Sequence, residues 1–107
     1  MLRLAGAEVT AVSGGRRALE ALKESPPDVL VSDIMMPDGD GLWLISEVRA
    51  LESGGAVPAI ALTSLVGNAD RRRILAAGYT AHLPKPVPIQ ELVRTVYRLA
   101  HRNTAGV

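Results

Sequence analysis

Short apolar runs and longer stretches of helical periodicity alternate along the chain. Four runs have the length of β-strands, and the second and third are apolar on both faces, as in a parallel sheet covered on both sides. The predicted strands are Glu8–Val12, Val29–Ser32, Ala59–Leu62 and Ala81–Leu83.

Apolar residues recur at helical spacing between these runs and after the last one. The predicted helices follow Ser13, cover Gly41–Leu51 and Asn68–Ala77, and begin at Pro88. The last helix has the most regular period, and the residues expected to face inward from it are Ile89, Leu92, Val93, Val96 and Leu99.

This order of elements predicts an α/β fold. Strands that alternate with helices indicate a parallel sheet with right-handed crossovers and helices on both faces. In open sheets of this kind, chemistry takes place at the carboxyl ends of the strands. Asp33 follows the second predicted strand, Thr63 the third and Lys85 the fourth. We therefore expect a carboxylate, a hydroxyl and an ammonium group to converge on one edge of the sheet.

The composition narrows the class of protein. The 107 residues are 48% hydrophobic, which suffices for one core and predicts a single domain over residues 1–107. A net charge of +1 argues against a dedicated nucleic-acid binder. Cysteine is absent, which excludes thiol chemistry and fits a cytoplasmic protein. No apolar run approaches the roughly 18 residues of a membrane span, and no signal peptide is present.

The three converging groups suit phosphoryl chemistry. A carboxylate can attack a phosphoryl group and form an acyl phosphate, and a lysine and a hydroxyl can hold the added oxygens. Each residue alone also has an ordinary interpretation, Asp33 as a turn former, Thr63 as a helix cap and Lys85 as a solvated side chain. Their shared position at strand ends favours the functional interpretation.

Four stretches of the sequence carry a family resemblance. They are "GAEVTAVSGGRRALEAL" at 6–22, "DIMMPDGDG" at 33–41, "IALTS" at 60–64 and "AAGYTAHLPKPV" at 76–87. Over nearly its whole length the chain resembles the receiver domains of two-component response regulators. The spelling "AHLPKPV" is most similar to receivers fused to hybrid histidine kinases. The resemblance implies a flavodoxin-like sheet and a signalling module rather than an enzyme.

The resemblance also implies residue roles. Asp33 would be the phosphoacceptor, Thr63 the switch hydroxyl, and Lys85 the residue that binds the phosphoryl oxygens. The bond from Lys85 to Pro86 would be cis. His82 occupies the position of a switch aromatic residue, usually Tyr or Phe. The implied partner is a histidine kinase or a phosphotransfer protein.

The chain departs from the family at the implied Mg²⁺ site. A complete receiver opens with a central strand that ends in two acids, followed by a helix. This sequence contains neither that strand, with its acidic pair, nor that helix. Asp33 and the backbone carbonyl of Met35 remain, and they are too few for a near-octahedral oxygen site. Asp38 and Asp40 are better explained as caps of the following helix. We therefore expect Mg²⁺ binding to be incomplete and phosphorylation to be slow or absent.

The same departure affects the sheet. Residues 1–5 are interpreted as the last turn of the helix that would follow the missing strand, with Gly6 as its C-cap. The strands at 8–12 and 29–32 must then pair directly, leave a gap or accept a strand from another chain. Unpaired buried edges are unfavourable, so we expect a rearranged four-stranded sheet, or a homo-oligomer or strand exchange that covers the gap. A chain that begins inside a longer reading frame is the third interpretation.

Two other functions remain open at this point. One is a degenerate receiver that acts only as an interaction scaffold, because it lacks the acidic pair. The other is a phosphoaspartyl hydrolase, which is disfavoured because the position of its usual general acid, two residues after Asp33, is occupied by Met35. The basic run Arg71-Arg72-Arg73 is interpreted as a solvated helix surface and not as a nucleic-acid site.

Overall fold

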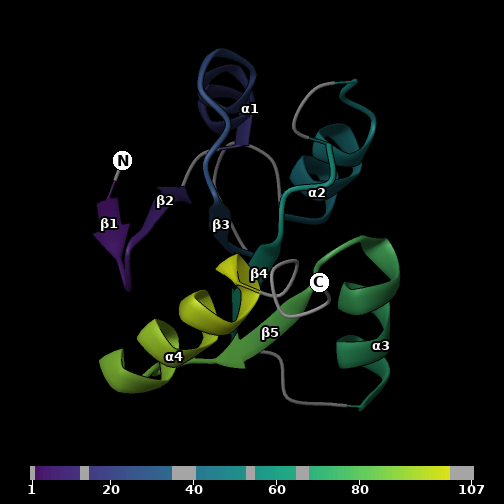
Figure 1. Ribbon diagram of the computed structural model, residues 1–107. Coiled ribbons are helices and arrows are strands. Elements are labelled where there is room, and N and C mark those ends of the chain that lie inside the picture. The colour runs from purple at the N-terminus through teal and green to yellow at the C-terminus, as the bar shows by residue number, and fades with distance from the viewer. Residues whose placement is uncertain (1, 13–14, 35–40, 53–54, 65–67, 102–107) are drawn as a thin grey trace.

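The computed structural model describes residues 2–12, 15–34, 41–52, 55–64 and 68–101 (Figure 1). Five strands and four helices lie in these ranges. They are β1 Leu2–Leu4, β2 Ala7–Val12, α1 Gly15–Glu24, β3 Val29–Asp33, α2 Gly41–Arg49, β4 Ala59–Thr63, α3 Asn68–Ala77, β5 Ala81–Pro84 and α4 Ile89–Ala100. The predicted alternation of strands and helices is therefore confirmed, with small shifts at the ends of the elements.

The five strands form one sheet in the order β1-β2-β3-β4-β5. Strands β2 to β5 are parallel, and β1 runs antiparallel to β2 at the edge of the sheet (Figure 1). Each face carries its own hydrophobic core. Leu44, Ile45 and Val48 of α2 join residues of α1 and α3 on one face, whereas Val96 and Leu99 of α4 join residues of β2, β3 and β4 on the other. Helices thus cover both faces, as predicted.

The amino-terminal residues correct one prediction. Residues 2–4 form strand β1 and not the last turn of a helix. Ala5 and Gly6 have φ angles of 52° and 81°, so they form the two-residue turn of a β-hairpin in which Leu4 pairs with Ala7. The alternation Leu2-Arg3-Leu4 suits such a strand, and Gly6 serves the turn rather than a helix C-cap.

The structure also shows how the sheet stays continuous without a strand between β2 and β3. β2 pairs directly with β3, and Val9 lies opposite Val29. The sheet has five strands instead of the expected four, because β1 adds to the outer edge of β2. Since β2 and β3 satisfy each other's hydrogen bonds, strand exchange is not required to cover them. Self-association remains a prediction.

The last helix differs from its predicted pattern at one end. Val96 and Leu99 are buried as expected, but the Ile89 side chain is 62% exposed. Ile89 is the first residue of α4, directly after the N-cap Pro88, and lies outside the packed part of the helix.

None of the helices within the described ranges is long and apolar enough to cross a membrane.

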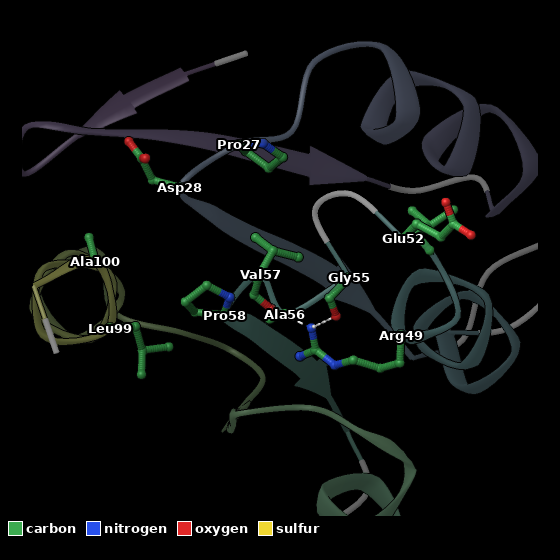
Figure 2. A pocket seen from close by; sticks show the side chains of 11 residues that line it. Pro27, Asp28, Arg49, Glu52, Gly55, Ala56, Val57, Pro58, Leu99 and Ala100 are labelled. Atoms are coloured by element: carbon green, nitrogen blue, oxygen red, sulfur yellow. Dashed lines mark hydrogen bonds between the residues drawn. The ribbon is translucent and has the colours of Figure 1, made fainter. Parts of the chain in front are cut away.

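Arg49 fastens the amino-terminal end of β4 to its surroundings. Its Nη1 donates hydrogen bonds to the carbonyl oxygens of Gly55 and Val57, at 2.8 and 2.6 Å (Figure 2). Its Nε and Nη2 donate to the carbonyl oxygen of Gly78, at 3.0 and 2.7 Å. One guanidinium group therefore ties the end of α2 to the segment before β4 and to the end of α3.

We expect Arg49→Met to lower the free energy of unfolding by about 2 kcal/mol, because several charge-assisted hydrogen bonds are lost while the aliphatic stem is retained. Urea denaturation measures the change. The matched control is Arg94→Met on the exposed surface of α4, which should change stability by less than about 0.5 kcal/mol. Equal stability of the two variants would contradict the role given to Arg49.

Candidate functional site

Three predicted site residues lie at the carboxyl ends of adjacent strands. Asp33 is the last residue of β3, Thr63 is the last residue of β4, and Lys85 directly follows β5. In the register of the sheet, Asp33 lies opposite Leu62, the residue before Thr63. The Lys85 N–H donates to the carbonyl oxygen of Thr63 at 2.9 Å. The structure therefore brings the acid, the hydroxyl residue and the lysine to one edge of the sheet.

An ion pair joins two of these residues. The Lys85 Nζ lies 2.5 Å from the Asp33 Oδ1. The Asp33 side chain is 29% exposed and that of Lys85 is 43% exposed, so the pair is open to solvent on one side. The Oδ1 atom itself is buried and, despite its contact with the ammonium group, has no partner in hydrogen-bond geometry among the described residues. The ammonium group of Lys85 thus compensates the negative charge of this oxygen, but it does not form a well-aligned hydrogen bond with it.

The backbone around Asp33 is held closely. The Ser32 side chain is fully buried, and its Oγ donates to the carbonyl oxygen of Asp33 at 3.0 Å. The N–H of Ile34 donates to the carbonyl oxygen of Leu62 at 3.1 Å, which extends the pairing of β3 with β4 past Asp33. Thr63 is 3% exposed and makes contacts of its own. The carboxylate is therefore presented from a rigid strand end.

Two further features agree with the predicted geometry. The peptide bond between Lys85 and Pro86 is cis, as the resemblance implies. His82 lies on β5 opposite Ala61 and is half-buried. It lines a cleft of about 270 Å³ between α3 and α4, together with Arg71, Leu75 and Arg98. The position implied for the switch aromatic residue thus borders the surface that these two helices form with β5.

Gly41 was not singled out from the sequence, yet it contacts the end of β3 directly. Its N–H donates to the carbonyl oxygen of Ile34 at 2.7 Å. A Cβ atom at this position would lie 2.5 Å from the carbonyl oxygen of Asp33 and 2.9 Å from the Cα of Ile34. The start of α2 can pack this closely against the end of β3 only because residue 41 has no side chain.

Of the Mg²⁺ ligands considered from the sequence, the structure describes only Asp33. The described residues contain no group of three or more His, Cys, Asp or Glu residues that could hold a metal ion. Asp33 offers one carboxylate, and its buried oxygen is already paired with Lys85. Met35, Asp38 and Asp40, the other residues considered from the sequence, lie outside the described ranges. Near-octahedral coordination of Mg²⁺ would therefore need oxygen ligands in addition to the Asp33 carboxylate.

A larger pocket is shown in Figure 2. It lies at the opposite end of β3 from Asp33, the last residue of that strand. It has a volume of about 640 Å³, and Pro27, Asp28 and Pro58 line it near the amino-terminal ends of β3 and β4. The donors of Arg49 in its wall already bind backbone carbonyl groups. The Asp28 Oδ2 in its wall likewise accepts a hydrogen bond from the N–H of Glu8, so these two polar side chains support the fold.

Comparison with known proteins decides the family. A model of the response regulator receiver domain matches residues 1–97. The chain belongs to this family. It is 44% identical over 96 residues to an uncharacterized 14.6 kDa protein of Leptolyngbya boryana, covering 90% of this chain and 73% of that protein. It is 34% identical over 106 residues to the sensor protein GacS of Pseudomonas syringae, covering 94% of this chain but only 12% of GacS.

Solved receiver structures confirm the fold. One is the receiver domain of the sensor histidine kinase PA1611 from Pseudomonas aeruginosa, with a magnesium ion coordinated in its active-site cleft. Its TM-score is 0.78 at 35% identity, covering 90% of this chain and 79% of that one. The chemotaxis response regulator CheY4 of Vibrio cholerae has a TM-score of 0.79 at 30% identity, covering 89% of this chain and 79% of CheY4. The flavodoxin-like fold inferred from the sequence is thereby established.

We expect Gly41→Ala to destabilise the chain by about 1–3 kcal/mol, because the new methyl group would overlap backbone atoms that cannot move away. The helix propensity of alanine returns only about 1 kcal/mol. Urea denaturation measures the loss, and Ser46→Ala on the exposed side of α2 is the control. A Gly41→Ala variant more stable than the parent chain would show that the contact with Asp33 is not tight.

Proposed function

We propose that the chain is a two-component phosphorelay receiver in which Asp33 accepts a phosphoryl group from a histidine kinase or a phosphotransfer protein. The observation that supports this most is the pairing of the Asp33 carboxylate with the Lys85 ammonium group at the carboxyl edge of the sheet. A carboxylate oxygen attacks phosphorus, the bond from phosphorus to the donor atom breaks, and an acyl phosphate forms on Asp33.

Lys85 then changes partner within the same site. Before transfer, its ammonium group faces the Asp33 carboxylate. Transfer moves the negative charge from the carboxylate onto the phosphoryl oxygens, which are stronger acceptors for a charged donor. We assign Lys85 to these oxygens after transfer and Thr63 to a hydrogen bond that its hydroxyl donates to one of them. Both assignments follow from the strand ends that these residues occupy.

The chemistry proceeds here with little help from a metal. Mg²⁺ supplies charge neutralisation at phosphoryl-transfer sites, and the described residues provide one carboxylate for it. Lys85 is the cation that lies beside the Asp33 carboxylate instead. We therefore propose slow uptake that depends weakly on Mg²⁺. The alternative is a degenerate receiver that works as a scaffold and is not phosphorylated at all.

The surface formed by α3, β5 and α4 is proposed as the partner surface. Residues 53–107 contain seven Lys or Arg and two Asp or Glu, whereas residues 1–52 contain five and nine. The cleft beside His82 brings two of the basic side chains, Arg71 and Arg98, next to the exposed apolar Leu75. Arginine beside apolar surface is common in protein interfaces. An acidic protein surface is thus the expected partner, rather than a nucleic acid.

We place the proposed phosphoryl transfer to Asp33 in the cytoplasm, in a single domain that spans residues 1–107.

The first prediction of this proposal concerns uptake. Incubation with acetyl phosphate should slowly add one phosphoryl group, detected by intact-protein mass spectrometry, and Asp33→Asn should abolish the addition. Replacing Mg²⁺ by EDTA should change the rate by less than about threefold, because the metal site is incomplete. No uptake from acetyl phosphate or from a phosphorylated histidine phosphotransfer protein would leave the scaffold alternative. Fast uptake that requires Mg²⁺ would contradict the incomplete site.

The second prediction separates uptake from switching. Thr63→Ala should retain phosphoryl uptake at Asp33, because the nucleophile is unchanged. The amide resonance of His82 should then respond to phosphorylation in the parent chain and not in the variant, as seen in ¹H–¹⁵N correlation spectra. Thr63→Ser keeps the hydroxyl and serves as the control. A His82 response that persists in Thr63→Ala would remove Thr63 from the switch.

A further inference from the structure

Tyr79 connects a distant part of the chain to the phosphoacceptor strand. It lies in the segment between α3 and β5 and is 4% exposed. Its hydroxyl donates a buried hydrogen bond to the carbonyl oxygen of Gly41, at 2.7 Å. Burying a tyrosine hydroxyl is unfavourable unless it finds a partner, so this bond fixes where the end of the ring lies.

Gly41 lies between the Tyr79 hydroxyl and the backbone of Asp33 and Ile34. Its N–H binds the carbonyl oxygen of Ile34 at 2.7 Å. A Cβ atom added to Gly41 would lie 2.5 Å from the carbonyl oxygen of Asp33 and 2.9 Å from the Tyr79 hydroxyl oxygen. The tyrosine hydroxyl, the glycine and the backbone of Asp33 are therefore packed against one another, with no room for one methyl group between them.

The segment that carries Tyr79 is itself anchored on both sides. Before it, the carbonyl oxygen of Gly78 accepts two hydrogen bonds from Arg49. After it, the Thr80 Oγ1 accepts a hydrogen bond from the N–H of Ala59 at 3.0 Å, and the Thr80 N–H donates to the carbonyl oxygen of Ala59 at 2.8 Å. Tyr79 thus extends from a fixed base, and its hydroxyl can act as a rigid support for Gly41.

We infer that Tyr79 is a positioning residue for Asp33. Through Gly41 it holds the end of β3 and the start of α2 at one separation, and this fixes the direction in which the carboxylate is presented. Reaction of a nucleophile depends steeply on such placement. The inference rests on the proposed function of Asp33 as phosphoacceptor, and it adds a residue that touches neither the carboxylate nor the phosphoryl group.

The test compares Tyr79→Phe with two controls. Thr80→Val removes one hydrogen bond from the same segment without touching Gly41, and Tyr97→Phe removes the hydroxyl of the tyrosine on α4, which is 55% exposed. Tyr79→Phe should slow phosphoryl uptake from acetyl phosphate roughly fivefold, the effect expected from one hydrogen bond. Both controls should take up the group at the parent rate, even though Thr80→Val also loses a hydrogen bond that supports the fold.

A second measurement does not depend on phosphorylation. In ¹H–¹⁵N spectra of the unphosphorylated chain, Tyr79→Phe should shift the amide resonances of Ile34 and Gly41, and Thr80→Val should leave them in place. If the parent chain takes up no phosphoryl group, the proposed function fails, and these shifts alone decide whether Tyr79 positions the strand end. Unchanged Ile34 and Gly41 resonances in Tyr79→Phe, or equal uptake by Tyr79→Phe and the parent chain, would overturn the inference.

Discussion

The parallel pairing of β3, β4 and β5 is the constraint on which the site depends. Parallel strands place their carboxyl ends at one edge, so three residues far apart in the sequence meet without any loop having to bring them together. The pairing continues past the strands, where Ile34 binds Leu62 and Lys85 binds Thr63 through backbone hydrogen bonds. The positions of Asp33 and Lys85 are thus set by the same interactions that hold the sheet.

The related PA1611 receiver has a magnesium ion coordinated in its active-site cleft. Here the described residues provide one carboxylate and one ammonium group, in contact with each other. A lysine can neutralise charge on a phosphoryl group, but it cannot orient several oxygens as an octahedral cation does. Direct pairing of β2 with β3 keeps the sheet continuous next to the strand that carries Asp33.

Much of this arrangement could be predicted from the sequence. Val29–Ser32 and Ala59–Leu62 are apolar on both faces, which is typical of covered parallel strands, and the polar residues that follow these runs stand out for that reason. The prediction that residues 1–5 end a helix was wrong, because three residues of alternating polarity fit a strand as well as the last turn of a helix. Their pairing depends on the turn at Ala5 and Gly6. Short segments of this kind are decided by the partner strand and not by their own pattern.

The supporting contacts could not be predicted. An arginine at the end of a helix usually points into solvent, and nothing near Arg49 in the sequence indicates that it binds Gly78, 29 residues away. Nothing near Tyr79 in the sequence indicates its hydrogen bond to Gly41, which spans 38 residues. Such contacts depend on the packing of whole elements, whereas the strand ends depend on local patterns that the sequence carries directly.

The most direct test of the account is to locate the modified residue. After incubation with a phosphorylated histidine phosphotransfer protein, borohydride reduces an aspartyl phosphate to a stable alcohol, and peptide mapping by mass spectrometry identifies its position. The account predicts reduction at Asp33 and at no other acid. Reduction at a different residue, or at none while the donor loses its phosphoryl group to water, would contradict the claim that the strand register makes Asp33 the acceptor.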